Sequence, residues 1–585
     1  MIPKILGVIR KIVAVIWVPL LVLIAGFAAQ RLMLISWNAV VGYKSPHLYE
    51  SMPVTPRRPA VGGRVVLVVV DGLRYDTAMG LPGLARLRER GAGLRLKTGE
   101  PSLSLPGWAV IGTGAWQEIT GVTTNWYKGR ILVDNIFAEA RRAGLETAVA
   151  GDPGWDALYG PWIGQKRLVR NDDRAVLREA LRLLAEKPDL LLVHFSSLDE
   201  AGHKSGGASR QYYTTARELD NLIGRLAESL DLRSTTLLIT SDHGHRDAGG
   251  HGGWEESVVT VPLVALGKGI RPGWTERGKQ ADIAPTVAAL LGTSLPQHSV
   301  GQPLYPVLSL SWPDRVALEL VVAEQRAAFD SRYVQVLGVS SLPGNAVFPL
   351  PARQAFKEGD LRKAEMELQR FDGLREAAVA SAREDRLKED RLRRLPLVGG
   401  ALILASLYLF ILPRHRYTGL AVSGALLYFA IYYAFYFIRG YHFSLSDMNS
   451  EEMLAGFFRQ RLLESGAALL LSGLVLANRV GRKKDATAHV LGKCAGGMVY
   501  VISYLLLIQV LIFAYLYGIR FEWALPDLRL GFKYYLDLLQ MYAVGLSAPG
   551  AVLTVVVFGK AVWWVTDRKQ RRRKRLARGR AGGTV

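Results

Sequence analysis

Long runs without a charged residue divide the chain into two kinds of sequence. One run lies near the start, and five more lie close together in the last third of the chain. A bilayer core of ~30 Å needs ~20 apolar residues of helix, so most of these runs are long enough to span a membrane. We therefore predict six transmembrane helices, over residues 12–30, 395–413, 417–438, 465–478, 494–519 and 538–559.

Two of these spans have an alternative interpretation. Residues 465–478 fall below the usual minimum of ~17 residues, so an interfacial or buried helix is the alternative there. Few charges flank residues 12–30, for which a cleaved signal peptide is the alternative. Because this run is longer than the ~7 to 15 residues of a signal-peptide core, we favour a permanent anchor over residues 1–36.

Between the first two spans the pattern changes to short β-rich apolar runs that alternate with helical periodicity, which is typical of an α/β domain. Residues 64–70, 190–194 and 235–240 are apolar on both faces, as in the buried strands of a parallel sheet. We predict a linker over residues 37–60, an α/β domain with a mostly parallel central sheet over 61–310, and a helical spacer over 311–394. A five-span bundle over 395–565 and a basic tail over 566–585 complete the chain.

The second half of the spacer, residues 352–394, is dense in alternating charges. Opposite charges four residues apart stabilise a solvated helix, so we interpret this segment as a connection between the outer domain and the bundle. A coiled coil that binds a partner is the alternative.

The distribution of Lys and Arg predicts the orientation of the spans. The tail after the last span holds nine basic residues and one acidic residue, and basic clusters also follow the second and fourth spans. Because Lys and Arg beside a span resist translocation, both termini are expected in the cytoplasm and residues from about 31 to 394 outside it. The net charge of +22 is then explained by contact with anionic lipid, and no pattern suggests binding to nucleic acid.

The single cysteine, Cys494, excludes an intramolecular disulfide and a zinc site built from several cysteines. Any metal must therefore bind His and carboxylate side chains.

Polar clusters follow the predicted strands, where an open α/β sheet binds its ligands. Any one of these residues has an ordinary structural explanation, such as a helix cap or a turn. Together they supply three aspartates, three histidines and a hydroxyl, a ligand set suited to two zinc ions or to manganese. The candidate residues are Asp71, Ser104, Asp199, His203, Asp242, His243 and His251.

In these clusters the sequence resembles the alkaline phosphatase superfamily, specifically its type I phosphodiesterase and nucleotide pyrophosphatase branch, over about residues 64–303. The resemblance implies an alkaline-phosphatase-like fold and two divalent metal ions, expected to be zinc, with manganese as the alternative. It also divides the ligands between the two sites. One metal is held by Asp199, His203 and His251, and the other by Asp71, Asp242 and His243.

The resemblance also implies the catalytic side chains. The nucleophile of this family precedes an x-Pro pair, which places it at Ser104 in Ser104-Leu105-Pro106. The amide of Asn125, in the segment 121–127, corresponds to a donor that binds a phosphoryl oxygen. Sulfatases share this fold but need Arg at the position that Trp108 occupies here, so sulfate-ester chemistry is not expected.

One anchor before the catalytic domain and a multi-span bundle after it resemble the layout of the glycosylphosphatidylinositol (GPI) ethanolamine phosphate transferases. This likeness implies a membrane-anchored phosphotransferase or phosphodiesterase that acts on a phospholipid headgroup through a phosphoserine, with membrane lipid as donor or acceptor. His245 and the glycine-rich stretch around His251 depart from that pattern and are closer to bacterial phosphodiesterases. The alternatives are a tethered nucleotide pyrophosphatase that acts on soluble substrates and a non-enzymatic scaffold or transporter.

Overall fold

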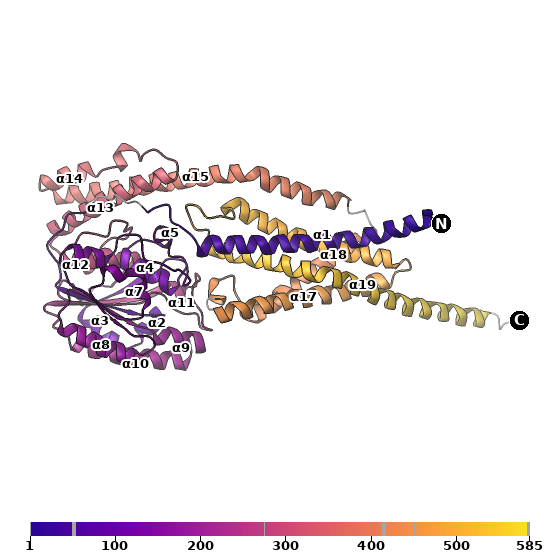
Figure 1. Cartoon of the computed structure of the whole chain (residues 1–585), viewed down its shortest axis with the longest axis horizontal. Coiled ribbons are helices and arrows are strands. Elements are labelled where there is room, and N and C mark those ends of the chain that lie inside the picture. The colour runs from indigo at the N-terminus through magenta and orange to yellow at the C-terminus, as the bar shows by residue number, and fades with distance from the viewer. Residues whose placement is uncertain (1, 49–53, 274, 412–416, 449–450, 582–585) are drawn as a thin grey trace.

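The computed structural model describes the chain except for residues 1, 49–53, 274, 412–416, 449–450 and 582–585. A domain built around one β-sheet lies at one end of the molecule, and a bundle of long helices extends from it (Figure 1). The first helix, α1 (Ile2–Val41), begins at the end of the bundle far from the sheet, and the last helix, α19 (Leu528–Ala581), ends there.

Eight strands form a single sheet in the order β4-β3-β5-β1-β6-β7-β2-β8. Strand β7 pairs antiparallel with both of its neighbours, and the other pairings in this sheet are parallel. The predicted mostly parallel sheet is therefore confirmed. The strands are β1 (Arg64–Val70), β2 (Ala92–Lys97), β3 (Thr147–Gly151), β4 (Gln165–Leu168), β5 (Leu190–Phe195), β6 (Thr235–Thr240), β7 (Thr260–Gly267) and β8 (Thr275–Lys279).

The three strands predicted from their apolar runs lie side by side, with β1 between β5 and β6. Their β-branched and Leu side chains suit a strand that is buried on both faces. In the register, Val70 pairs with Phe195 and Val69 pairs with Thr240, so the three carboxyl ends meet at the same edge of the sheet.

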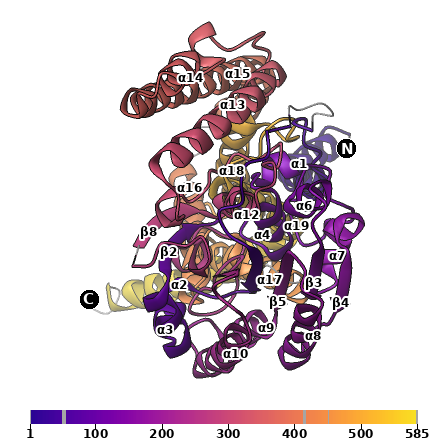
Figure 2. The ribbon, with the colours of Figure 1, turned by 90° about the vertical axis from the view of Figure 1, so that its left-hand side faces the viewer.

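Helices cover both faces of the sheet (Figure 2). Alternate side chains of β1 point to opposite faces, so that Val66 and Val68 lie in one hydrophobic core and Val65 and Leu67 in the other. The first core includes residues of α3 (Pro82–Arg90), α8 (Asp173–Ala185) and α10 (Arg210–Glu228). The second includes residues of α4 (Ser104–Thr113), α6 (Ile136–Arg142), α7 (Gly154–Tyr159) and α12 (Ile283–Leu291). Short helices α2 (Tyr75–Met79), α5 (Gln117–Thr120), α9 (Ser197–Ser205) and α11 (Glu256–Val259) lie in the connections.

Three helices connect the sheet domain to the bundle: α13 (Trp312–Val336), α14 (Leu350–Lys357) and α15 (Leu361–Ile411). One face of α13 is buried against the sheet domain through Phe329 and Tyr333. Phe371 of α15 packs on α13, and the buried Arg375 of α15 pairs with Asp330 of α13. The charged segment 352–394 thus has a packed face as well as a solvated one.

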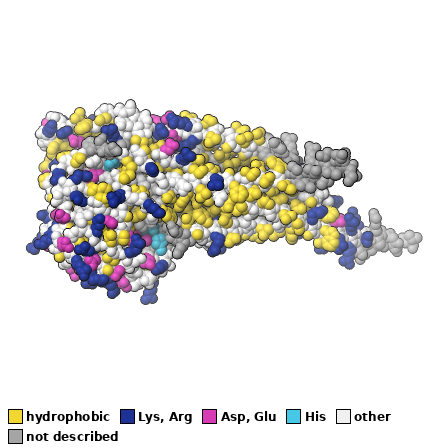
Figure 3. Space-filling model, in the orientation of Figure 1, with side chains coloured by type: hydrophobic (Ala, Val, Ile, Leu, Met, Phe, Trp, Pro, Cys, Tyr) yellow, Lys and Arg dark blue, Asp and Glu magenta, His cyan; other side chains and the backbone are white. Residues whose placement is uncertain are grey.

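The bundle contains α1, α16 (Thr418–Ile438), α17 (Glu451–Gly481), α18 (Ala488–Tyr517) and α19. Among the described residues, five helices are long and apolar enough to cross a membrane, over Val15–Val41, Thr418–Ile438, Leu454–Gly481, Ala488–Tyr517 and Leu528–Arg575. Hydrophobic side chains cover much of the bundle surface (Figure 3). The chain is therefore a multi-pass membrane protein. The short predicted span 465–478 lies inside the longer helix α17. The predicted span 395–413 begins within α15, which ends at Ile411, and its residues 412 and 413 lie outside the described residues.

Candidate active site

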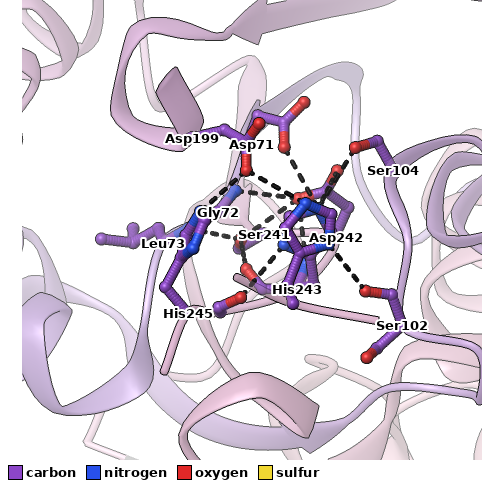
Figure 4. Close-up of polar contacts among 12 residues, drawn as sticks. Asp71, Gly72, Leu73, Ser102, Ser104, Asp199, Ser241, Asp242, His243 and His245 are labelled. Atoms are coloured by element: carbon purple, nitrogen blue, oxygen red, sulfur yellow. Dashed lines mark hydrogen bonds and ion pairs between the residues drawn. The ribbon is translucent and has the colours of Figure 1, made fainter. Parts of the chain in front are cut away.

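The carboxyl ends of the three central strands bring the predicted polar residues together (Figure 4). Asp71 directly follows β1, Asp199 lies in the first turn of α9 after β5, and Asp242 and His243 follow β6. Because β5, β1 and β6 are neighbours, these side chains enter one site from adjacent strands.

Asp71, Asp242 and His243 form one buried cluster, in which one ligand atom of each lies within 4.8 Å of the others. His243 Nε2 lies 3.3 Å from Asp71 Oδ1. Asp242 is fixed by three donors, because its Oδ1 accepts the backbone N–H groups of Gly72 and His243 and its Oδ2 accepts the indole N–H of Trp108 at 2.8 Å. The cluster is therefore held in place by the chain around it.

Asp199 is the centre of the second cluster. Its carboxylate lies 2.8 Å from His245 Nε2, 3.4 Å from His251 Nε2 and 3.3 Å from His203 Nε2. The imidazole rings of His243 and His251 stack with centroids 3.6 Å apart, so the two clusters are adjacent. His251 is oriented by its Nδ1, which lies 3.1 Å from the carbonyl oxygen of Ser102.

The geometry adds two histidines that the sequence interpretation left outside the ligand set. His245 is fully buried and, together with Asp199, His243 and His251, forms a group that could hold a metal ion. His203 is not in that group, although its Nε2 lies 3.1 Å from His251 Nε2. His194, from within β5, lies 3.4 Å from Asp71 Oδ2. The spacing His243-x-His245 in the sequence could have indicated His245 as a ligand. His194 lies inside an apolar strand, where no sequence pattern indicates a role at the site.

The glycine at position 72 makes room for this arrangement. Its φ of +73° lies in the left-handed region that favours glycine, and a Cβ there would lie 3.0 Å from both Asp199 Cα and the ring of His245. A side chain at this position would therefore press against both Asp199 and His245 and shift them from their present positions.

Ser104 and Asn125 lie next to each other at the edge of the site. Ser104 is the first residue of α4, and its Oγ lies 3.2 Å from His243 Nε2. Asn125 Oδ1 accepts the backbone N–H of Leu105 at 3.0 Å, which holds the amide beside the start of α4. Ser102 is 1% exposed and donates to the carbonyl of Gly253, so its hydroxyl is already engaged.

The charges at this site fit divalent cations. Burial raises the pKa of Asp71 well above its ordinary value, and the nearby carboxylates of Asp242 and Asp199 raise it further. Asp71 Oδ1 is buried without a hydrogen-bond partner. Burial opposes ionisation of Asp199 as well, but His251 and His203 hold its pKa well below the usual range. Bound cations would satisfy the unpartnered oxygen and relieve the repulsion among the carboxylates.

A loop of the bundle contacts the segment that carries His251. We call residues 443–447, between α16 and α17, the docking loop. The Oγ of Ser446 accepts the backbone N–H of Gly253 at 3.0 Å, and the carbonyl of Phe443 accepts the indole N–H of Trp254 at 3.2 Å. A Cβ on Gly253 would lie 1.8 Å from Ser444 Oγ, so the two segments approach as closely as glycine allows.

An ion pair fixes the same contact. Arg246 Nη1 donates to Asp447 Oδ1 at 2.5 Å, and Asp447 is 2% exposed. Histidine side chains are seen near this junction of domain and bundle (Figure 3). The two clusters of Asp and His therefore lie on the side of the sheet domain that faces the bundle.

Comparison with known proteins supports an enzyme of phosphoryl chemistry. Residues 65–258 match the model of the family described as type I phosphodiesterase/nucleotide pyrophosphatase. The chain is 27% identical to the catalytic subunit of human GPI ethanolamine phosphate transferase 2, covering 43% of this chain and 28% of that protein. It is also 27% identical to GPI ethanolamine phosphate transferase 2 of Aspergillus fumigatus, covering 42% of this chain and 37% of that protein. The matched part is thus about a third of the length of these relatives.

The solved structure of murine ectonucleotide pyrophosphatase/phosphodiesterase 5 aligns with 42% of this chain and 100% of that chain, with a TM-score of 0.37 at 14% identity. The phosphonate monoester hydrolase of Silicibacter pomeroyi aligns with 42% of this chain and 77% of that chain, with a TM-score of 0.33 at 16% identity. The sequence matches are the stronger finding. They show that residues 65–258 are similar to the type I phosphodiesterase/nucleotide pyrophosphatase family, and that the chain is similar in sequence to the GPI ethanolamine phosphate transferases.

Proposed function

We propose that this protein transfers or removes a phosphoethanolamine-type headgroup of a membrane phospholipid through a phosphoserine at Ser104. The observation that carries this proposal is the position of Ser104. Its hydroxyl lies at the start of a helix, 3.2 Å from His243, beside two clusters of Asp and His. The segment that carries His251 of these clusters contacts the docking loop of the bundle through Gly253.

The chemistry requires two displacements at phosphorus. In the first, Ser104 Oγ forms a bond to phosphorus, the bond from phosphorus to the glycerol oxygen breaks, and diacylglycerol leaves. The serine hydroxyl releases its proton to solvent, and the glycerol oxygen of the leaving diacylglycerol takes up a proton from solvent. In the second, a hydroxyl of water or of a lipid-linked glycan takes the phosphoryl group, and Ser104 regains its proton.

We assign Asp71, Asp242 and His243 to one metal ion and Asp199, His203 and His251 to another, with His245 as an additional candidate ligand of the second. Two zinc ions bound there would supply positive charge that stabilises the phosphoryl oxygens and lowers the pKa of the serine hydroxyl. Asn125 is exposed, and because its Oδ1 is anchored by Leu105, its Nδ2 remains to donate to a phosphoryl oxygen.

The docking loop supports a lipid substrate. A soluble substrate needs no contact between the catalytic domain and a bundle, but a headgroup must be met at the membrane surface. Together with the basic tail, this arrangement supports both termini on the cytoplasmic side and the catalytic domain outside the cytoplasm, with six spans. We propose a lipid-linked glycan as the acceptor, because the names of the relatives specify GPI.

The proposal is tested with purified full-length protein and phosphatidylethanolamine labelled in its acyl chains. We expect release of labelled diacylglycerol that needs a divalent cation. Rapid cleavage of nitrophenyl nucleotide esters with no diacylglycerol would instead establish a phosphodiesterase for soluble substrates that is tethered to the membrane.

Replacing Arg246 by alanine should separate the docking of the loop from the chemistry. The change leaves the buried carboxylate of Asp447 without its partner, which costs about 3 to 5 kcal/mol for a buried ion pair. We expect hydrolysis of a soluble nitrophenyl ester to fall much less than release of diacylglycerol. Arg233→Ala is the control, because that side chain is 94% exposed and pairs with Asp231 at the surface. Equal losses on both substrates would show that the contact does not serve the lipid substrate.

A further inference from the structure

A pocket lies where α15 meets the bundle. It has a volume of ≈520 Å³ and lies between the middle of α15 and the segment from Gly518 to Pro526 that joins α18 to α19. Arg394 of α15 directly precedes the predicted span 395–413, and α18 ends at Tyr517. The pocket therefore lies where the helices of the bundle emerge on the side of the sheet domain, and none of the Asp and His residues of the candidate active site lines it.

The lining of this pocket is rich in arginine. It contains five arginines and two acidic residues, a formal charge of +3. Acidic residues outside the pocket neutralise two of the arginines, since Glu118 pairs with Arg383 and Glu389 pairs with Arg393. The lining arginines are Arg383, Arg386, Arg393, Arg394 and Arg520, and the acids are Asp390 and Glu522.

One carboxylate is shared by most of the remaining polar groups. Asp390 lies 3.3 Å from Arg386 Nε and 3.5 Å from Arg394 Nη2, and it also accepts the indole N–H of Trp523 at 3.0 Å. The Nε of Arg386 is buried and makes no hydrogen bond. Once Glu118 and Glu389 are counted against Arg383 and Arg393, the other three arginines face two carboxylates, Asp390 and Glu522, so a net charge of +1 remains.

The titration of Arg394 reflects this environment. Burial lowers the pKa of its guanidinium, Asp390 and Glu522 oppose that shift, and the positive charges of Arg391 and Arg386 add to it. The guanidinium also lies against the backbone, because a Cβ on Gly518 would approach its Cζ to 3.1 Å. Arg394 is thus held in place among like charges, where an anion would be stabilised.

The pocket is apolar on the side of the membrane. Leu397 and Val398 of α15, Ala514 of α18 and Ile519 belong to its lining, and the side chain of Leu397 is 80% exposed. Trp and Tyr side chains suit the boundary between lipid and water, and Tyr517 and Trp523 lie in the same lining. The arginines of this lining suit the phosphate headgroup of a phospholipid, and its apolar side chains suit the acyl chains.

We propose that this pocket binds the phosphate-bearing headgroup of an anionic membrane lipid, with the acyl chains beside Leu397 and Val398. Arginine suits phosphate because it can donate two parallel hydrogen bonds, and apolar side chains lie beside the arginines in the same lining. The site is separate from the candidate active site, so it holds a lipid that is not consumed there.

The test is native mass spectrometry of the full chain in detergent, titrated with dioleoyl phosphatidylglycerol. We expect this lipid to bind more tightly than dioleoyl phosphatidylcholine. The double variant Arg386→Gln/Arg520→Gln should weaken binding about thirtyfold, and the exposed Arg520→Gln alone about fivefold, which corresponds to about 1 kcal/mol for each arginine. Arg520→Gln does not touch the Asp390 network, so it remains informative if the double variant fails to fold.

Arg370→Gln is the matched control, because Arg370 lies on the same helix and its side chain is 74% exposed. This variant should bind phosphatidylglycerol as the parent does. Equal affinity of the parent, Arg520→Gln and the double variant would overturn the proposal. Full displacement of the lipid by millimolar inorganic phosphate would also overturn it, since the pocket would then be a site for a soluble anion.

Discussion

Replacing Ser104 by alanine should lower turnover of any phosphodiester substrate by about 10⁴-fold or more, as removal of a catalytic serine does elsewhere. The change removes the hydroxyl that lies 3.2 Å from His243 Nε2 and leaves the Asp and His residues of both clusters in place. We therefore expect the variant to bind the same number of metal ions as the parent, measured by elemental analysis alongside the steady-state rate.

Ser102→Ala is the matched control for this experiment. Ser102 is two residues away, but its hydroxyl donates to the carbonyl of Gly253 and does not contact the clusters. It should retain nearly the parent activity, and Ser104→Thr should retain a measurable fraction because it keeps a hydroxyl. Substantial activity of Ser104→Ala with both metals bound would mean that water attacks phosphorus directly, and the configuration at phosphorus would then invert.

Asp199→Asn should empty one metal site and lower activity by at least about 100-fold. This carboxylate is the common partner of His203, His245 and His251, with distances of 3.3, 2.8 and 3.4 Å. Asparagine keeps the shape but removes the negative charge, so the three imidazoles lose the group that draws a cation between them. Elemental analysis should find about one ion fewer per chain than in the parent.

The neighbouring Glu200→Gln is the control for Asp199→Asn. Glu200 lies on the same helix α9, and its exposed side chain pairs with Lys204, so metal content and activity should not change. If Asp199→Asn keeps the metal content of the parent, the assignment of the second cluster as a metal site is wrong.

The central strands and the confluence of polar residues could be predicted from the sequence because both depend on local pattern. Residues 64–70, 190–194 and 235–240 are mostly apolar runs, and polar residues follow each of them closely. Parallel pairing then requires those polar residues to meet at one edge. Asp71, Asp199 and Asp242 could therefore be placed together without a structure.

Other features depend on contacts between distant residues, to which no local pattern corresponds. His245 reaches Asp199 because Gly72 and Gly202 have no side chains, and a Cβ on Gly202 would lie 2.5 Å from its ring. The pair of Arg246 and Asp447 joins residues 201 positions apart. In the bundle, the uncharged run 465–478 covers only 14 residues, yet helix α17 extends from Glu451 to Gly481. The longer helix can be apolar inside the bundle because Arg461 and Glu464 pair with each other and are buried by neighbouring side chains.

The most direct test of a phosphoserine mechanism is mass spectrometry of the peptide that contains Ser104, from protein quenched with acid during turnover of phosphatidylethanolamine. The account predicts a phosphoethanolamine group on Ser104 that is absent without the lipid and in Ser104→Ala. Diacylglycerol release with no adduct on Ser104, even when the acceptor is withheld, would contradict it.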